Sequence, residues 1–190
     1  MPGASLEAVT GRLGVGAVAF LGLFLMVDGL QVGVFELVET YGKSSTWGIV
    51  GVVPTAVVIY VIGVFCVGIA ELGLSRFAVF DGPKPRDILV VSRSGPGLLQ
   101  QVYADHLRNH ELLKGAAVSF MILAVGSLAE WRTLPGFEIV VVLATGGAIL
   151  LSCLSLVFAR RAMGQAAALA AVAQNETPPN QKMEPARSGE

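Results

Sequence analysis

The sequence predicts an all-α polytopic membrane protein: a four-transmembrane-helix bundle in which an amphipathic cytoplasmic helix leads into the third span. Of the 190 residues, 54% are hydrophobic and only 14% are charged, whereas a soluble domain carries about 25% charged residues. The chain therefore lacks the charged side chains that cover a water-facing surface. Its apolar runs also approach the roughly 20 residues that a helix needs to cross a bilayer.

The first two spans are expected at about 13–36 and 46–72, after a short N-terminal segment, 1–12. Leu13 to Val27 is uncharged, and the span must include Asp28 to reach the length of a bilayer. No small-residue cleavage site follows this run, so the interpretation is an uncleaved span rather than a signal peptide. The second span lies in the uncharged stretch 44–70, where Pro54 could kink the helix.

The third and fourth spans are expected at about 112–129 and 138–159. Lys114 stands near the start of the third, where its long side chain is expected to reach the interface. The fourth is uncharged over 139–159 and ends at Arg160. The final segment, 161–190, is expected to form an alanine-rich helix up to about residue 174, followed by a disordered polar tail over 175–190.

The positive-inside rule orients these spans, because loops on the cytoplasmic side carry an excess of Lys and Arg. The two short loops on one side hold only Lys43 and Arg132. Trp47 and Trp131 fall on that same side, where indoles mark an interface. Both termini and the loop 73–111 are therefore expected in the cytoplasm of a bacterial inner membrane. The other eleven basic residues lie on the cytoplasmic side: Arg12, Arg76, Lys84, Arg86, Arg93, Arg108, Lys114, Arg160, Arg161, Lys182 and Arg187.

The cytoplasmic loop divides into a turn-rich part and a helical part. Residues 81–87 contain two prolines, which argue against a helix, and 88–91 (ILVV) could form a short strand or an apolar contact patch. From 98 to 113 the spacing becomes helical, and this helix is expected to run directly into the third span. Its apolar stripe consists of Leu99, Val102, His106, His110 and Leu113.

A loop of this size points to a protein partner. About 37 residues cannot bury an independent core, so the loop must lean on the membrane, on its neighbours or on another protein. The residues expected to contact a cytoplasmic protein are Lys84, Arg86, Arg93, His106, Arg108 and His110.

Asp28 and the polar residues that follow it are the candidate intramembrane site. On a helix, Asp28, Gln31 and Glu39 fall within roughly 80° of one another, and Glu36 widens the arc. A carboxylate that faces lipid is costly, so this stripe should line a bundle interior, an oligomer axis or water. It could form a pore or a proton site. Alternatively, the span ends early so that Asp28 reaches the headgroups, or Asp28 holds helices in register.

The sequence offers little for catalysis or cofactor binding. His106 and His110 are four residues apart on one helix face, but a zinc site needs further ligands, and no metal is expected. The segment YGKSS (41–45) lacks the first glycine of a phosphate-binding loop. Cys66 and Cys153 are expected as buried small hydrophobes. The chain is therefore expected to be no enzyme, to bind no cofactor, and to contact no nucleic acid directly.

Small residues indicate close helix packing. Gly29 and Gly33 form a G-x-x-x-G pattern on the first span, and Ala144, Ala148 and Ser152 begin a small-residue stripe on the fourth. Such residues let helices approach closely in lipid. The partner helix could belong to a second copy, which would make the protein a homo-oligomer, or to the same chain.

Two functions remain open. In the first, the chain is a non-enzymatic membrane sensor, effector or scaffold subunit that couples to a cytoplasmic partner through its middle loop. Stress and defence systems contain subunits of this general build, which is an architectural analogy only. In the second, it is a channel or an ion- or proton-coupled carrier that uses Asp28.

Overall fold

The computed structural model describes residues 3–30, 45–74, 76, 84–93, 97–132, 136 and 138–176, and the elements assigned there are all helices. Four of them contain stretches long and apolar enough to cross a membrane. The all-α prediction is thus confirmed, and the four long helices suit a multi-pass membrane protein. In chain order the elements are α1 (Gly3–Leu30), α3 (Ser45–Leu74), α4 (Pro85–Arg93), α5 (Gly97–Ala129), the 3₁₀ helix η2 (Glu130–Arg132) and α6 (Glu138–Glu176).

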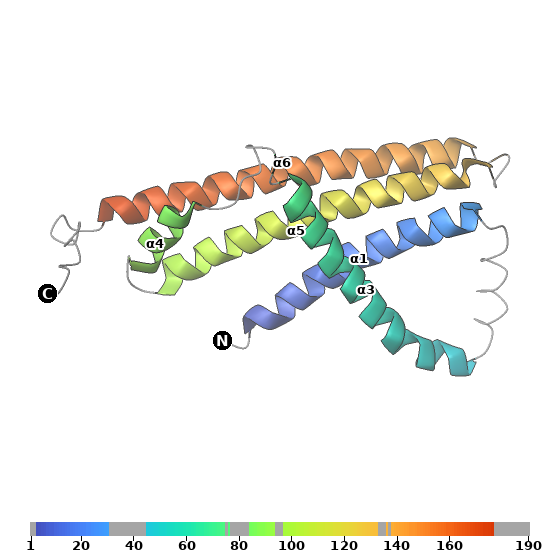
Figure 1. The fold of residues 1–190 in the computed structure, drawn as a ribbon, viewed down its shortest axis with the longest axis horizontal. Helices are drawn as coiled ribbons and strands as arrows, with labels where there is room; N and C mark the ends of the chain where they lie inside the picture. Colours follow the sequence, from blue (N-terminus) through green and yellow to red (C-terminus); the bar gives the residue numbers. More distant parts are fainter. Residues whose placement is uncertain are drawn as a thin grey trace, which may run out of the picture.

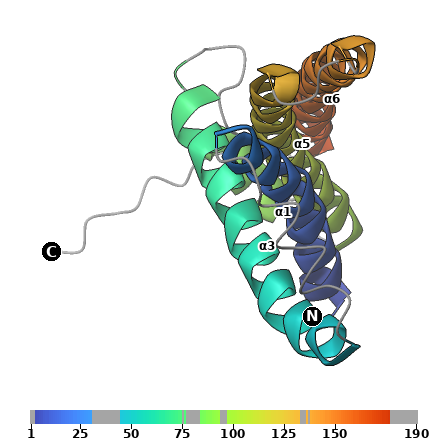
Figure 2. The same ribbon diagram turned by 90° about the vertical axis from the view of Figure 1, so that its right-hand side faces the viewer.

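The long helices form an elongated bundle around α5 (Figure 1). Helices α5 and α6 run antiparallel side by side along the long axis, and α1 lies against α5. Helix α3 crosses the others at a wide angle and packs on both α1 and α5, as the turned view also shows (Figure 2). Helix α5 therefore contacts every other long helix.

Helices α5 and α6 are much longer than a bilayer core. Their 33 and 39 residues correspond to about 50 and 58 Å, against about 30 Å of hydrocarbon. Both helices continue past the apolar bundle at the end far from η2, where α4 packs on them. We call α4, residues 97–111 of α5 and residues 160–176 of α6 the helical extension.

The helical extension has a small core of its own. Val91 of α4 and Tyr103 of α5 are buried against three alanines of α6, namely Ala166, Ala170 and Ala173. The three alanines are three or four residues apart, so they share one helix face. Their short side chains let α4 and α5 approach α6 closely. The loop segment is thus packed on the alanine-rich helix of the same chain.

Helix α4 corrects the expectation of a turn over 85–87 and of a short strand over 88–91. Pro85 takes the first helical position, where its fixed φ suits a helix and its missing N–H costs nothing. The carbonyl of Lys84 accepts hydrogen bonds from the backbone N–H groups of Asp87 and Ile88. Asp87 also places a negative charge in the first turn, where it favours a helix. A proline that argues against a helix interior therefore starts one here.

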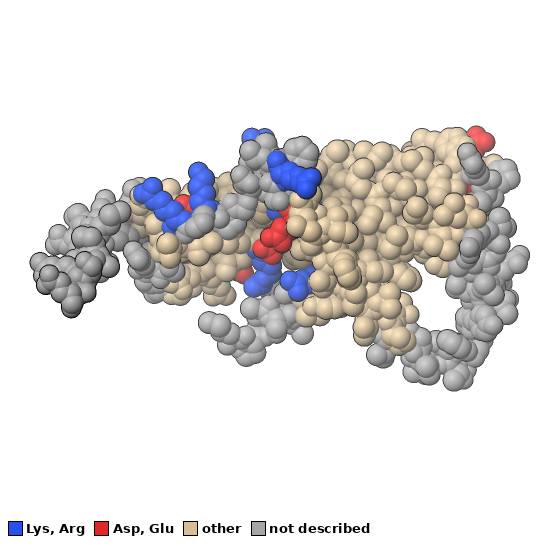
Figure 3. Space-filling view, viewed as in Figure 1, with Lys and Arg blue, Asp and Glu red and all other residues tan. Residues whose placement is uncertain are grey.

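The bundle beyond the extension is apolar on its outside. Phe65, Leu143 and Leu150 are all at least 60% exposed, which suits a lipid environment and not water. Figure 3 shows Lys and Arg gathered over the middle of the molecule and the helical extension, while the opposite half is almost free of charge. The described part of this face thus divides into a charged zone and an apolar zone.

Other predicted helices are present in the structure, with different first and last residues. The helix over 98–113 runs without interruption into the third span, as expected, and α3 continues through Pro54. The fourth span and the alanine-rich segment form one helix, α6. Lys114 is buried rather than extended to the interface, because α5 lies at the centre of the bundle. The loop 31–44 and the tail 177–190 lie outside the described residues.

Candidate functional site

The outer side of α4 is an exposed surface of mixed character. Val90 and Val91 pack toward the core of the helical extension, whereas Ile88 and Leu89 are 46% and 55% exposed. Lys84 and Arg86 beside them are also exposed. Two of the basic residues predicted to contact a partner thus flank an exposed apolar pair. We call Lys84, Arg86, Ile88 and Leu89 the α4 surface.

The other predicted contact residues lie elsewhere. Arg93 is the last residue of α4, and its side chain lies outside the described part of the structure. Arg108 forms an ion pair with Asp105, one turn away on α5, with 3.7 Å between Nη1 and Oδ1. A surface pair of this kind contributes little to stability. His106 is partly buried on the same helix. The predicted set therefore does not form one continuous surface.

His110 is a packing residue, which corrects the expectation that it belongs to a contact surface. Its side chain is 2% exposed, and its Nδ1–H donates a hydrogen bond of 2.8 Å to the carbonyl of Ala159 on α6. Its Nε2 atom is buried and has no hydrogen-bond partner among the described residues. The bond ties α5 to α6 where the apolar bundle meets the helical extension.

Asp28 lies in the last described turn of α1 and is partly buried. Gln31, Gly33, Glu36 and Glu39 lie outside the described residues, so the predicted polar stripe stays a prediction. Glu130 of η2 is buried, and η2 packs on α1, the helix that carries Asp28. Glu130 is not among the candidate residues of the sequence analysis.

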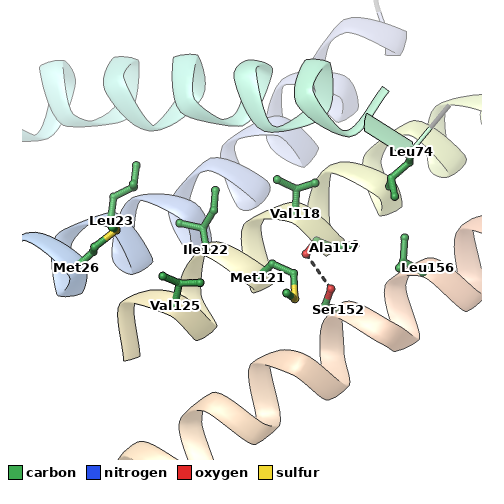
Figure 4. Close-up of a pocket in the computed structure, with 10 residues that line it drawn as sticks. All are labelled: Leu23, Met26, Leu74, Ala117, Val118, Met121, Ile122, Val125, Ser152 and Leu156. Atoms are coloured by element: carbon green, nitrogen blue, oxygen red, sulfur yellow. Dashed lines mark hydrogen bonds between the residues drawn. The ribbon is translucent and has the colours of Figure 1, made fainter. Parts of the chain in front are cut away.

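An open apolar cavity of about 350 Å³ lies among the four long helices. Its lining comes from all four helices and includes Leu23 and Met26 of α1 and Met121 and Val125 of α5 (Figure 4). Its one hydroxyl belongs to Ser152, which donates a hydrogen bond of 2.9 Å to the carbonyl of Ala117. Among the described residues, no titratable side chain lines this cavity. Such a lining favours hydrocarbon over water or ions.

Metal and thiol chemistry find no support in the described part of the chain. No three His, Cys, Asp or Glu residues come together there as a metal site. Cys66 is buried as expected, whereas Cys153 is exposed on the outer face of α6. Both thiols are free.

The predicted small-residue stripe of α6 packs within the chain. Ala148 and Ser152 are buried, and the Ser152 hydrogen bond to α5 identifies the facing helix. Ala144 is exposed, so the buried part of the stripe begins one turn later. Gly29 packs on Ala129, because a Cβ at position 29 would lie 2.8 Å from the Ala129 backbone. These small residues therefore bring α1, α5 and α6 of one chain together.

The two alanines of the stripe provide a matched test. Ala148→Val is expected to lower the free energy of unfolding by about 1–2 kcal/mol, because added methyl groups overpack a close helix contact. Ala144→Val adds the same groups to an exposed position and is expected to leave stability unchanged. Thermal unfolding of the purified protein in detergent measures both. Equal losses of stability in the two variants would contradict this packing.

No protein-family model, curated protein or solved structure matches this chain. The function therefore has to be argued from the chain's own geometry.

Several residues that organise the structure escaped the sequence analysis. Tyr103 is buried in the helical extension, although it lies beside the predicted stripe and not within it. Gly22 of α1 and Gly126 of α5 pack backbone to backbone. The sequence did hold a signal for this glycine contact. Gly11 and Gly22 are eleven residues apart, as are Gly115 and Gly126, and eleven residues bring a helix back to nearly the same face.

Proposed function

We propose that this chain is a non-enzymatic, multi-pass membrane protein that holds a cytoplasmic protein partner, acting as a sensor, effector or scaffold subunit. The observation that carries the proposal is the helical extension, which is packed around its own core and presents the α4 surface outward. A plain connector between two spans has no need of such a unit. A bacterial inner membrane and a homo-oligomeric assembly belong to the same proposal.

The position of the α4 surface favours a soluble partner over the bilayer. Helix α4 packs on Ala166, Ala170 and Ala173, which follow Arg160 by about 9–20 Å along the helix axis. Arg160 and Arg161 end the apolar part of α6, and basic residues at the end of a span favour a position at the membrane surface. The exposed Ile88 and Leu89 therefore lie beyond the interface, where a protein can cover them.

The charge distribution supports a cytoplasmic position for the helical extension. Lys84, Arg86, Arg108, Arg160 and Arg161 all belong to the extension or directly precede α4. Basic residues close to spans are retained on the cytoplasmic side. An apolar pair flanked by Lys84 and Arg86 suits a partner surface that combines apolar and acidic side chains.

Native mass spectrometry of the full chain, purified in mild detergent with its co-purifying proteins, tests the proposal. Wild type is expected to retain a defined partner, and Leu89→Asp to reduce its retention by about tenfold or more, as at an interface hot spot. Val172→Asp is the control, because Val172 is similarly exposed on α6 but lies on a different helix face from the alanines that hold α4. A partner equally retained by Leu89→Asp would overturn the docking surface.

A channel or carrier is the second candidate, and the observation in its favour is Asp28. This carboxyl group lies in the candidate span Val9–Leu30. The cavity among the four long helices is apolar, so an ion path would have to form between subunits or at the outer end. Under this alternative, Asp28→Asn abolishes flux in proteoliposomes. Under the scaffold proposal, it leaves partner retention intact, whereas deletion of 84–98 abolishes that retention.

A further inference from the structure

A second cavity, of about 610 Å³, opens where the bundle meets the helical extension. It lies between α5 and α6, and α1 contributes Val15. This volume is within the range of small-ligand sites. The cavity is distinct from the α4 surface, which is formed by another element.

Polar and apolar residues occupy opposite ends of this cavity. Toward the helical extension it is lined by His106 and Asn109 of α5 and by Arg161 and Gln165 of α6. Toward the bundle, the antiparallel course of the same helices brings apolar side chains, among them Ala116 and Phe158. The lining therefore changes from hydrogen-bonding side chains to hydrocarbon side chains along the direction of α5 and α6.

The polar end suits an anion. The four polar side chains named above carry N–H groups that can donate hydrogen bonds, and no Asp or Glu of the described part of the chain lines the cavity. The Arg161 guanidinium lies over the Phe158 ring, 5.8 Å from its centroid, a geometry that helps to hold the charge beside the opening. Arginine is suited to phosphate because its planar fork can donate two parallel hydrogen bonds.

We propose that this cavity binds one anionic phospholipid from the adjoining membrane leaflet. The phosphate lies at Arg161, His106, Asn109 and Gln165, and an acyl chain follows the apolar lining past Phe158 and Ala116 toward Val15. Basic pockets between transmembrane helices at this depth are suited to anionic headgroups. Because α1, α5 and α6 all line the cavity, the bound lipid joins α1 to the hairpin of α5 and α6.

The test is lipid retention by the full chain in mild detergent, measured by native mass spectrometry during titration with phosphatidylglycerol or phosphatidylcholine. Wild type is expected to retain phosphatidylglycerol preferentially and to unfold at a higher temperature when it is bound. Arg161→Gln is expected to weaken this retention by about tenfold, the effect of losing a charge-assisted hydrogen bond. Gln165→Leu, a second exposed cavity position, should weaken it to a smaller extent.

Arg160→Gln is the matched control. Arg160 is exposed and adjacent to Arg161, so the variant removes the same charge at the same depth, but Arg160 does not line the cavity. Retention by Arg160→Gln within about twofold of wild type supports a site. Equal weakening in both variants would show diffuse attraction and overturn the proposal, as would equal retention of phosphatidylcholine. Displacement by soluble glycerophosphate would overturn the lipid assignment in favour of a free phosphate ester.

Discussion

Gly126→Ala is expected to lower the free energy of unfolding by about 3 kcal/mol, the upper end of the range for overpacked cores. The reason is the crossing of α5 and α1. A Cβ at position 126 would overlap the carbonyl oxygen of Gly22, and it would lie 3.0 Å from the Gly22 Cα. Both atoms are backbone, so no side-chain rotation relieves the clash and the two helices must move apart.

Gly147→Ala is the control for this prediction. Nothing lies within 4 Å of a Cβ at Gly147, which is exposed on α6. Alanine there is expected to leave stability unchanged or to raise it, because glycine is the weaker helix former by about 1 kcal/mol. Thermal unfolding in detergent, followed by Trp fluorescence, compares the variants. If Gly126→Ala proves as stable as Gly147→Ala, the crossing of α1 and α5 is not as described.

Ala170→Asp is expected to release α4 from the helical extension. Ala170 is buried among Val91, Tyr103 and neighbouring alanines of α6. A carboxylate in that core has no cation to pair with among these cluster residues, and burying an unpaired charge costs several kcal/mol. Amide hydrogen exchange over 85–93 is therefore expected to rise by about 100-fold or more, as for a locally unfolded segment.

Ala171→Asp provides the comparison. Ala171 is the next residue of α6 and is exposed, so the same charge meets water there and exchange over 85–93 should stay as in wild type. Exchange in the apolar part of α5, beyond Leu112, should not change in either variant. Unchanged exchange over 85–93 in Ala170→Asp would show that α4 does not depend on this core. If α4 is the docking surface, the same variant also loses its cytoplasmic partner.

The four long helices could be predicted because their signal is local. A helix that crosses a bilayer must satisfy its backbone internally and expose apolar side chains along its length, so composition alone reveals it. The stretch from 98 to 129 was predicted as one helix because no breaker intervenes, and α5 confirms this. The shorter α4 was not predicted, because Pro85 was interpreted as a turn residue. The short apolar run ILVV that follows fits a strand as well as a helix, since it is too short to show a helical period.

The candidate sites could be predicted less well, because residue type does not reveal which face of a helix is covered. His110 and His106 share a predicted stripe, yet the first is buried on the Ala159 carbonyl and the second lines an open cavity. Arg160 and Arg161 are adjacent residues of the same type, so the sequence does not distinguish them, but only Arg161 lines that cavity. The difference follows from how α6 is rotated against α5.

The sequence by itself determined the number of long helices, their apolar character and the concentration of basic residues at one end. Each of these depends on single residues or short runs and on their preference for lipid or water. Only the tertiary structure decided that the alanines after Arg161 support α4 and that Gly22 meets Gly126. It also decided that one apolar cavity, and a second cavity with a polar end, lie where α1, α5 and α6 meet. These features depend on contacts between segments far apart in the chain, and close packing of backbones, not hydropathy, selects them.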